Sequence, residues 1–224
     1  MSFGDKKLSE IAISVPGSTS LLREYDLDFC CGGSDTLANA AAEKGLNLAE
    51  IETRLTELQN SKAENPEEYW VGATYPEIID HILVRYHQRH REQLQELIVL
   101  ADRVESVHGD RDDCPIGVAA ELRNVYEDLS NHMMKEEHVL FPMIKAGNYM
   151  MAQMPIRMME MEHAEHGEHL DVLKSLTNNM TPPADACNTW LALYSGIQEF
   201  IDDLMMHIHR ENNILFPRVI AENH

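Results

Sequence analysis

The sequence contains few basic residues, few aromatic residues and no long apolar run. Its 224 residues include 18 Lys and Arg but 38 Asp and Glu, which gives a formal net charge of −20. A surface this acidic repels phosphate backbones and anionic lipids, so we expect neither nucleic acid nor a membrane among its partners. No apolar stretch is long enough to span a bilayer, and residues 1–10 lack the apolar core of a signal peptide. We therefore expect a soluble protein of the cytoplasm.

Cysteine is scarce as well, with 4 residues in the chain. Cys30 and Cys31 are adjacent, and one chain step is too short for ordinary disulfide geometry. A chain of this length also builds a core without disulfides, so we expect reduced thiols. Alternating β-branched segments are few, and most of the sequence is rich in Leu, Met, Ala and Glu, which favour helix. The predicted fold class is all-α.

Proline and glycine divide the chain into a small part and a large part. Residues 1–60 are predicted to form a small helical N-terminal domain, with helices over 18–25, 36–44 and 48–59. The stretch 61–73 is polar and contains Pro66 and Gly72, so it is interpreted as a linker. Residues 74–224 are predicted to form the larger domain.

Four long helices are predicted in this larger domain. Thr74 and Glu77 have the spacing of a capping box around Pro76, which marks the start of the first helix. The predicted bounds, in chain order, are Thr74 to about His108, Cys114-Pro115 to near Gly147, Met154-Pro155 to near Asn179, and Thr181 to near Pro217. Long helices with short connections predict an antiparallel up-down four-helix bundle.

The second and fourth of these helices carry the same pattern of metal-ligand residues. Both read His-x3-Glu-x3-Leu-Phe-Pro, at His132 and Glu136 and again at His207 and Glu211, 75 residues apart. A single His/Glu pair of this kind is usually a solvated surface pair. Its recurrence before the same Leu-Phe-Pro indicates an internal repeat that preserves metal-ligand types.

The first and third helices carry a second repeated pattern. Each contains His-x2-His, at His87 and His90 and again at His163 and His166, 76 residues apart. Together with the first pattern, this indicates a repeated helical hairpin. Apolar periodicity leaves open which His of each pair faces the core, and in the first helix it slightly favours His90.

These residues together predict a buried site for two divalent cations. A His and a Glu four residues apart lie one above the other on a helix, so each pair presents an imidazole and a carboxylate to the same point. With one His from each remaining helix, four His and two Glu converge, which suits two cations bridged by carboxylates. Such donors fit Fe, Mn or Zn, and an open position on each metal would suit oxygen or nitric oxide chemistry.

Two further motifs are interpreted as structural. Leu-Phe-Pro is interpreted as a kink that ends the helix and packs in the core. The Met-rich run at residues 148–161, NYMMAQMPIRMMEM, is interpreted as adaptable packing in the core and the connection.

Four stretches carry a resemblance to a known family: YDLDFCCGG, IIDHILVRYHQRHREQL, HMMKEEHVLFPMIK and HIHRENNILFPR. Through them the whole chain resembles the Repair of Iron Centers family, bacterial hemerythrin-like proteins that restore iron–sulfur clusters damaged by nitric oxide or oxidants. The resemblance implies a di-iron site held by His87, His132, Glu136, His163, His207 and Glu211. It thereby selects the first His of each His-x2-His pair and leaves His90 and His166 to orient ligands or relay protons.

The implied ligand set has one His fewer than that of the oxygen-carrying hemerythrins. Each of two Fe ions would take two His and one oxygen from each bridging Glu, and an oxo or hydroxo bridge is compatible with this set. Fewer ligands favour iron that is able to leave, which suits an iron donor better than an oxygen carrier.

We therefore expect a stress protein that repairs damaged iron–sulfur proteins by supplying iron, by removing nitric oxide, or by both. Cys30 and Cys31 are candidate redox thiols, with ordinary reduced cysteines as the alternative. Two other classes stay open: a hemerythrin-type protein that binds or senses oxygen or nitric oxide, and a di-iron nitric oxide or peroxide reductase. The sequence does not decide whether the protein is an enzyme or forms a homodimer.

Overall fold

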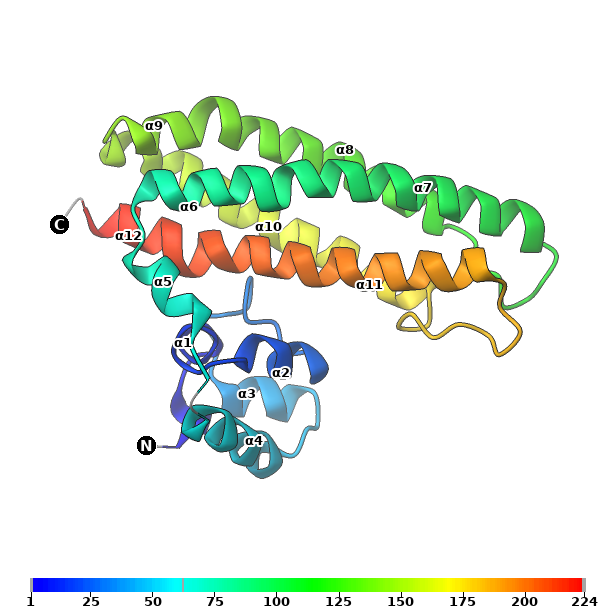
Figure 1. Cartoon of the computed structure of the whole chain (residues 1–224), viewed down its shortest axis with the longest axis horizontal. Coiled ribbons are helices and arrows are strands. Elements are labelled where there is room, and N and C mark those ends of the chain that lie inside the picture. Colours follow the sequence, from blue (N-terminus) through cyan, green and yellow to red (C-terminus); the bar gives the residue numbers. More distant parts are fainter. Residues whose placement is uncertain (1, 62, 223–224) are drawn as a thin grey trace. The chain divides into compact units, whose positions relative to one another are not determined.

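The structure, a computed structural model, describes residues 2–61 and 63–222 (Figure 1). Every regular element among these residues is a helix, apart from one isolated antiparallel bridge between Lys7 and Thr36. The predicted all-α class is confirmed. No helix in the described part of the chain combines the length and the apolarity that crossing a bilayer requires. The chain forms two compact units, one of residues up to 78 together with those from 208 onward, and one of residues 79–207.

The first unit is built from short helices. They are the 3-10 helix η1 (Phe3–Asp5), α1 (Leu8–Ser14), α2 (Ser18–Glu24), α3 (Leu37–Glu43), α4 (Leu48–Asn60), α5 (Pro66–Gly72), the π-helical segment η4 (Arg210–Leu215) and α12 (Phe216–Ala221). The three helices predicted at 18–25, 36–44 and 48–59 are confirmed as α2, α3 and α4. Helix α1 was not predicted.

Helix α5 lies inside the stretch that was interpreted as a linker. Asn65 caps its first turn, since the side-chain oxygen of Asn65 accepts a hydrogen bond from the Glu67 N–H. Glu67 is buried and accepts two hydrogen bonds from Arg210 of η4, at 2.5 and 3.2 Å. The Arg210 guanidinium also lies over the Trp70 ring, 4.7 Å from its centroid. A charge pair this well buried needs both partners in place, so it holds α5 against η4.

The second unit contains the long helices. They are η2 (Ile82–His87) and α7 (Gln88–His108), which continue α6 (Tyr75–His81); α8 (Val118–Lys135), η3 (Glu136–Leu140) and α9 (Phe141–Lys145); α10 (Tyr149–Leu176); and α11 (Asn188–His209). The segments η2 and η3 are π-helical. Figure 1 shows α7, α8, α10 and α11 as long rods running side by side.

Polar contacts between neighbouring rods give their directions. Arg91 contacts Glu137, and further along α7 Asp102 contacts Arg123, so α7 and α8 are antiparallel. Between η2–α7 and α11, Arg85 contacts Asp203 while Arg89 contacts Glu199. Between α8 and α10, Glu121 contacts His169 while Lys135 contacts Glu162. In all three helix pairs, residue numbers rise along one helix where they fall along the helix that it contacts. This confirms the antiparallel four-helix bundle.

The buried residues of α8 and α10 follow a heptad-like spacing that includes His and Glu. On α8 and η3 the stripe contains Val118, Leu122, Val125, Leu129, His132 and Glu136. On α10 it contains Ala152, Ile156, Met159, His163, His166, Leu170 and Leu173. Steps of three and four residues keep all of these on one helix face. The same periodicity that buries the apolar side chains therefore also carries the polar ones into the core.

Several predicted helix bounds are wrong. Helix α8 begins at Val118 and not at Cys114-Pro115, because Gly117 precedes it in a left-handed conformation with φ of 103°. Helix α10 begins at Tyr149, so Pro155 lies in its second turn instead of at its start. Helix α11 begins at Asn188, several residues after the predicted Thr181. Proline in these connections marked a turn nearby and not the first helical residue.

The interpretation of the Met-rich run as core packing is wrong for most of its methionines. Met159 is buried, but five others are exposed: Met150, Met151, Met154, Met158 and Met161. The buried stripe of α10 passes through Ala152, Ile156 and Met159, so methionines on the other faces of the helix point outward. Composition alone does not reveal the face on which each Met lies.

A pair of glycine substitutions tests the helix assignment. A Cβ at Gly167, inside α10, meets no atom within 4 Å, whereas Gly117 has a φ of 103° that L residues rarely adopt. We expect Gly167→Ala to raise the free energy of unfolding by about 0.5–1 kcal/mol through helix propensity. Gly117→Ala should lower it by about 1–2 kcal/mol. Thermal unfolding of the metal-free protein, followed by circular dichroism, measures both. Shifts of the same sign in the two variants contradict the assignment.

Candidate metal centre

All six residues predicted to bind metal are buried and fall into two groups. The groups are His87, Glu136, His207 and Glu211, and His132, Glu136, His163 and Glu211. In each group one ligand atom from every residue lies within 4.8 Å of the others. None of the six is more than 1% exposed. Because Glu136 and Glu211 belong to both groups, the arrangement offers two adjacent binding points that share two carboxylates.

Within each group the imidazole nitrogens face one another. The Nε2 atoms of His87 and His207 are 3.2 Å apart, and those of His132 and His163 are 3.1 Å apart. Glu136 Oε2 lies between the groups, 3.3 Å from His87 Nε2 and 3.4 Å from His132 Nε2. Among the described residues, neither oxygen of Glu136 has a hydrogen-bond partner.

Two further carboxylates fix the orientation of two of these imidazoles. His87 Nδ1 is 2.8 Å from Glu137 Oε1, and His132 Nδ1 is 2.9 Å from Glu162 Oε2. The hydrogen bond from His87 lowers the pKa of Glu137 to about 2, and the hydrogen bond from His132 lowers the pKa of Glu162 to about 2. Both carboxylates are therefore ionised near neutral pH and accept hydrogen bonds without donating. Each histidine must then carry its proton on Nδ1, which leaves a lone pair on Nε2.

This arrangement fits a divalent cation in each group. The Nε2 lone pairs of His87 and His132 face the Glu136 carboxylate, and a buried carboxylate without a hydrogen bond is costly in a dry core. A cation between these donors removes that cost. Imidazole nitrogen with carboxylate oxygen suits Fe, Mn or Zn better than the all-oxygen preference of Ca or Mg.

Wide helical turns lie next to the ligands. The backbone N–H of Gln88 donates to Leu83 O, that of Phe141 to Glu136 O, and that of Phe216 to Glu211 O. Each of these bonds spans five residues instead of the four of an α-helix, and such π-turns are frequent at functional sites.

The first of these turns explains why periodicity alone did not single out His87. The extra residue in η2 advances the helix phase, so Tyr86 and His87 are both buried, and His90 is buried as well. His87 joins the first group and His90 does not. A constant 3.6-residue period places both His87 and His90 near the apolar stripe and slightly favours His90.

The Leu-Phe-Pro motifs also take their conformation from these turns. Phe141 and Phe216 are buried, as expected for core packing. The predicted end of the helix is wrong, because α9 and α12 continue through Pro142 and Pro217. A proline ring clashes with the carbonyl four residues earlier in a regular helix, and the wide turn just before each proline shifts that carbonyl.

His90 and His166 lie outside both groups, although both are buried. Burial lowers the pKa of His90 well below its ordinary value, and burial followed by the charge of His132 lowers the pKa of His166 to about 2. Both are therefore neutral imidazoles. Their expected role in orienting ligands or relaying protons stays a prediction.

Cys30 and Cys31 lie in a tight loop around Asp28. The Asp28 carboxylate accepts hydrogen bonds from the N–H groups of Cys30, Cys31 and Gly32, at 3.0, 2.9 and 2.8 Å. Gly33 is required here, because a Cβ at this position would lie 2.5 Å from Phe29 O. The two sulfurs are 3.9 Å apart and form no disulfide. The hydrogen bond with Cys31, and then burial, raise the pKa of Cys30 well above its usual value, so its thiol is protonated near neutral pH. A redox role for these thiols stays a prediction, and reactive thiols ordinarily have a lowered pKa.

Glu137 and Glu162 are functional candidates that the sequence analysis missed. Each is adjacent in the chain to a predicted ligand, Glu136 and His163 respectively. Shifting Glu137 forward by 75 residues gives Asn212, and shifting Glu162 back by 76 gives Tyr86. These carboxylates therefore break the internal repeat, so the repeat does not predict them. Their only sequence signal was an acidic residue directly beside a ligand.

The bundle and its central His/Glu groups define a hemerythrin-type cation-binding protein. Residues 78–219 match the hemerythrin HHE cation binding domain family, and residues 4–59 match a family described as a domain of unknown function, DUF542. A Haemophilus influenzae protein named probable iron-sulfur cluster repair protein is 68% identical over 99% of this chain and 100% of its own length. Proteins named iron-sulfur cluster repair protein YtfE from Musicola paradisiaca and from Escherichia coli O81 are each 55% identical, over 98% and 99% of both chains. The chain belongs to the hemerythrin-like family that contains these iron–sulfur cluster repair proteins.

Glu137 and Glu162, called the outer carboxylates below, give a test of the site that leaves the six predicted ligands unchanged. We expect Glu137→Gln and Glu162→Gln each to weaken metal binding about 10- to 100-fold, because the amide no longer fixes the histidine proton on Nδ1. Competition with a chromophoric chelator for Fe²⁺ measures the affinity. Glu96→Gln, an exposed charge on α7, is the control. Equal affinities in all four proteins would show that these carboxylates do not act on the site.

Proposed function

We propose that this chain holds two iron ions in the paired His/Glu groups and uses them to repair damaged iron–sulfur clusters of other proteins. The observation that carries the proposal is the sharing of Glu136 and Glu211 between the two groups. Shared carboxylates suit two adjacent ions bridged by the protein, the plan of di-iron bundle proteins.

The small number of protein donors for each ion supports the proposal that the iron is able to leave the site. Each ion would be held by two histidines and by one oxygen from each shared carboxylate, assigned as His87 with His207 and His132 with His163. Four protein donors leave coordination positions open on an ion that takes six. When bound, such an iron pair offers exchangeable positions to small ligands such as nitric oxide or oxygen, and accommodates an oxo or hydroxo bridge.

The chain's own residues keep this site dry and fixed. Tyr86 stacks on the ring of His207 with centroids 5.3 Å apart, and Phe141 stacks on His87 at 5.8 Å. Glu137 and Glu162 hold their histidines with Nε2 ready to bind, so little reorganisation is needed when an ion enters or leaves.

The names of the relatives support cluster repair as the use of this iron. At 55 to 68% identity over nearly the whole length, the relatives match both parts of the chain and not only the bundle. No observation favours an oxygen carrier or a nitric oxide reductase over repair.

The metal content of carboxylate variants tests the site. We expect about two iron ions per chain in protein purified without oxygen, and far less in Glu136→Ala and in Glu211→Ala, because each change removes a donor from both groups. Elemental analysis with a Glu96→Ala control measures this. Stoichiometric zinc, or an iron content that neither variant changes, contradicts the proposal.

Transfer of labelled iron tests the function itself. Protein loaded with ⁵⁷Fe is incubated without oxygen with a [4Fe–4S] dehydratase whose cluster has been damaged by nitric oxide. We expect the dehydratase to regain activity and to acquire ⁵⁷Fe, detected by Mössbauer spectroscopy. The Glu136→Ala protein and an equal amount of free Fe²⁺ are the controls. Recovery no greater than with free Fe²⁺ overturns the repair function, whereas recovery without ⁵⁷Fe overturns iron donation and leaves nitric oxide removal.

A further inference from the structure

The loop that carries Cys30 and Cys31 brings together three side chains able to bind a metal ion. One donor atom each from Asp28, Cys30 and Cys31 lies within 4.8 Å of the other two. The loop belongs to the first compact unit, and none of these residues is part of the paired His/Glu groups. Cys30 is buried, Cys31 is half-buried and Asp28 is exposed. The donors therefore lie at the edge of the core, with the carboxylate open to solvent.

The distance between the two sulfurs matches the spacing of two thiolates on a tetrahedral metal ion. Sulfurs that each lie about 2.3 Å from such an ion are about 3.8 Å apart. The Sγ atoms of Cys30 and Cys31 are 3.9 Å apart, a spacing that an S–H···S hydrogen bond also allows in the metal-free protein. Side chains of consecutive residues point to opposite faces of a strand and do not face each other on a helix. The loop has thus turned both thiols to one side.

Asp28 supplies an oxygen donor beside the two sulfurs. Its Oδ1 lies 3.2 Å from Cys30 Sγ and accepts a hydrogen bond from that thiol. A carboxylate oxygen and a thiolate on one tetrahedral ion are about 3.6 Å apart, so a shift of about 0.4 Å is enough when an ion replaces the thiol proton. Two sulfurs with one carboxylate suit Zn²⁺, Fe²⁺ or Co²⁺, whereas Ca²⁺ and Mg²⁺ prefer oxygen donors alone.

The loop is held in this conformation by side chains outside the cluster. The side-chain amide of Asn212 donates to Cys30 O at 3.1 Å. The side-chain amide of Asn213 donates to Phe29 O at 2.8 Å. Both asparagines belong to η4, which lies in the same compact unit as the loop. Because the backbone is fixed before an ion arrives, binding costs little further ordering of the loop.

Metal binding suits these thiols better than redox chemistry does. The hydrogen bond with Cys31, and then burial, raise the pKa of Cys30 well above its usual value. A thiol that keeps its proton is a poor nucleophile, but a divalent cation displaces the proton as it binds the sulfur. Two S–H bonds are replaced by two sulfur–metal bonds, two protons pass to solvent, and no electron is transferred.

We propose that Asp28, Cys30 and Cys31 form a separate metal site, which binds one thiophilic divalent cation through two thiolates and one carboxylate oxygen. Three protein donors leave the fourth position of a tetrahedral ion open to water or to a ligand from another protein. The site differs in chemistry from the paired groups, which offer only imidazole and carboxylate. It does not depend on the proposed function, because the cation binds whether or not those groups hold iron.

Titration with Co²⁺ tests the site in the full chain. Protein with reduced thiols is titrated without oxygen, and the absorption from sulfur-to-cobalt charge transfer is followed. Thiolate ligands give this absorption, and the paired His/Glu groups contain none, so Co²⁺ bound there stays silent. We expect the absorption in the unaltered chain. Cys30→Ser and Cys31→Ser should each weaken the binding that produces it about 100-fold or more, because each removes one sulfur ligand.

Matched variants show whether the effect belongs to this loop. Cys114→Ser/Cys187→Ser removes the two other cysteines, and Glu43→Gln removes an exposed carboxylate of α3 in the same unit. Both should bind Co²⁺ with unchanged absorption and affinity. Asp28→Asn should weaken binding about tenfold or more.

A second probe keeps the test independent of how well the variants fold. The NMR spectrum of ¹¹³Cd²⁺ bound to the unaltered chain gives a separate resonance for each site, and its chemical shift reports the number of sulfur ligands. We expect one resonance from a site with two thiolates. A resonance typical of four thiolates, which means an ion shared between two chains, overturns the site. So does the absence of charge-transfer absorption in the unaltered chain, or equal absorption in Cys30→Ser/Cys31→Ser. A chain that takes up no iron overturns the proposed function alone.

Discussion

A buried carboxylate among imidazole lone pairs is the constraint on which the rest of the structure depends. Glu136 is fully buried, its carboxylate oxygens have no hydrogen-bond partner among the described residues, and Oε2 lies 3.3 and 3.4 Å from two Nε2 atoms. In a dry core this arrangement is unfavourable until a cation joins it. A wide turn begins at Glu136, and the outer carboxylates Glu137 and Glu162 bind two of the histidines. We interpret both features as holding the donors in place despite that cost.

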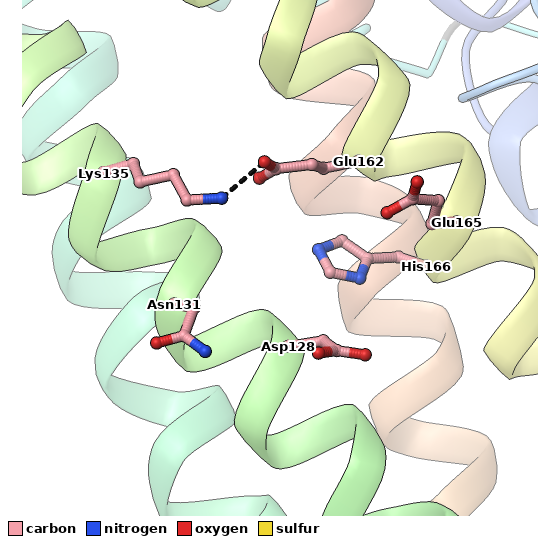
Figure 2. Close-up of a pocket in the computed structure, with 6 residues that line it drawn as sticks. All are labelled: Asp128, Asn131, Lys135, Glu162, Glu165 and His166. Carbon is pink, nitrogen blue, oxygen red and sulfur yellow. Dashed lines mark hydrogen bonds and ion pairs between the residues drawn. The ribbon is translucent and has the colours of Figure 1, made fainter.

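The outer carboxylates Glu137 and Glu162 surround the inner donors. They set the proton positions of His87 and His132, so they bear on how tightly an ion is held. Glu162 is also paired with the ammonium of Lys135, in the polar pocket between α8 and α10 (Figure 2). The affinity matters for an iron donor, because an ion held too tightly is of no use to a damaged cluster.

Much of this was predictable from sequence, and the failures have physical causes. The repeated His-x3-Glu and His-x2-His patterns identified the bundle and the ligand-bearing faces, since ligands and apolar residues share one stripe. Periodicity could not distinguish His87 from His90, because the π-turn in η2 changes the helical period next to His87. Only the family resemblance selected His87. Glu137 and Glu162 were missed because the repeat has Asn212 and Tyr86 at the equivalent positions. Helix ends at proline were misplaced, since a π-turn lets the chain continue through Pro142 and Pro217.

The central claim is that the two groups hold a pair of ions that share Glu136 and Glu211, and not two unrelated single ions. X-ray absorption at the iron K edge, on protein loaded without oxygen, tests this most directly. We expect imidazole scattering together with an iron–iron shell. Iron surrounded by light atoms alone, with no second iron in its neighbourhood at full loading, would contradict it.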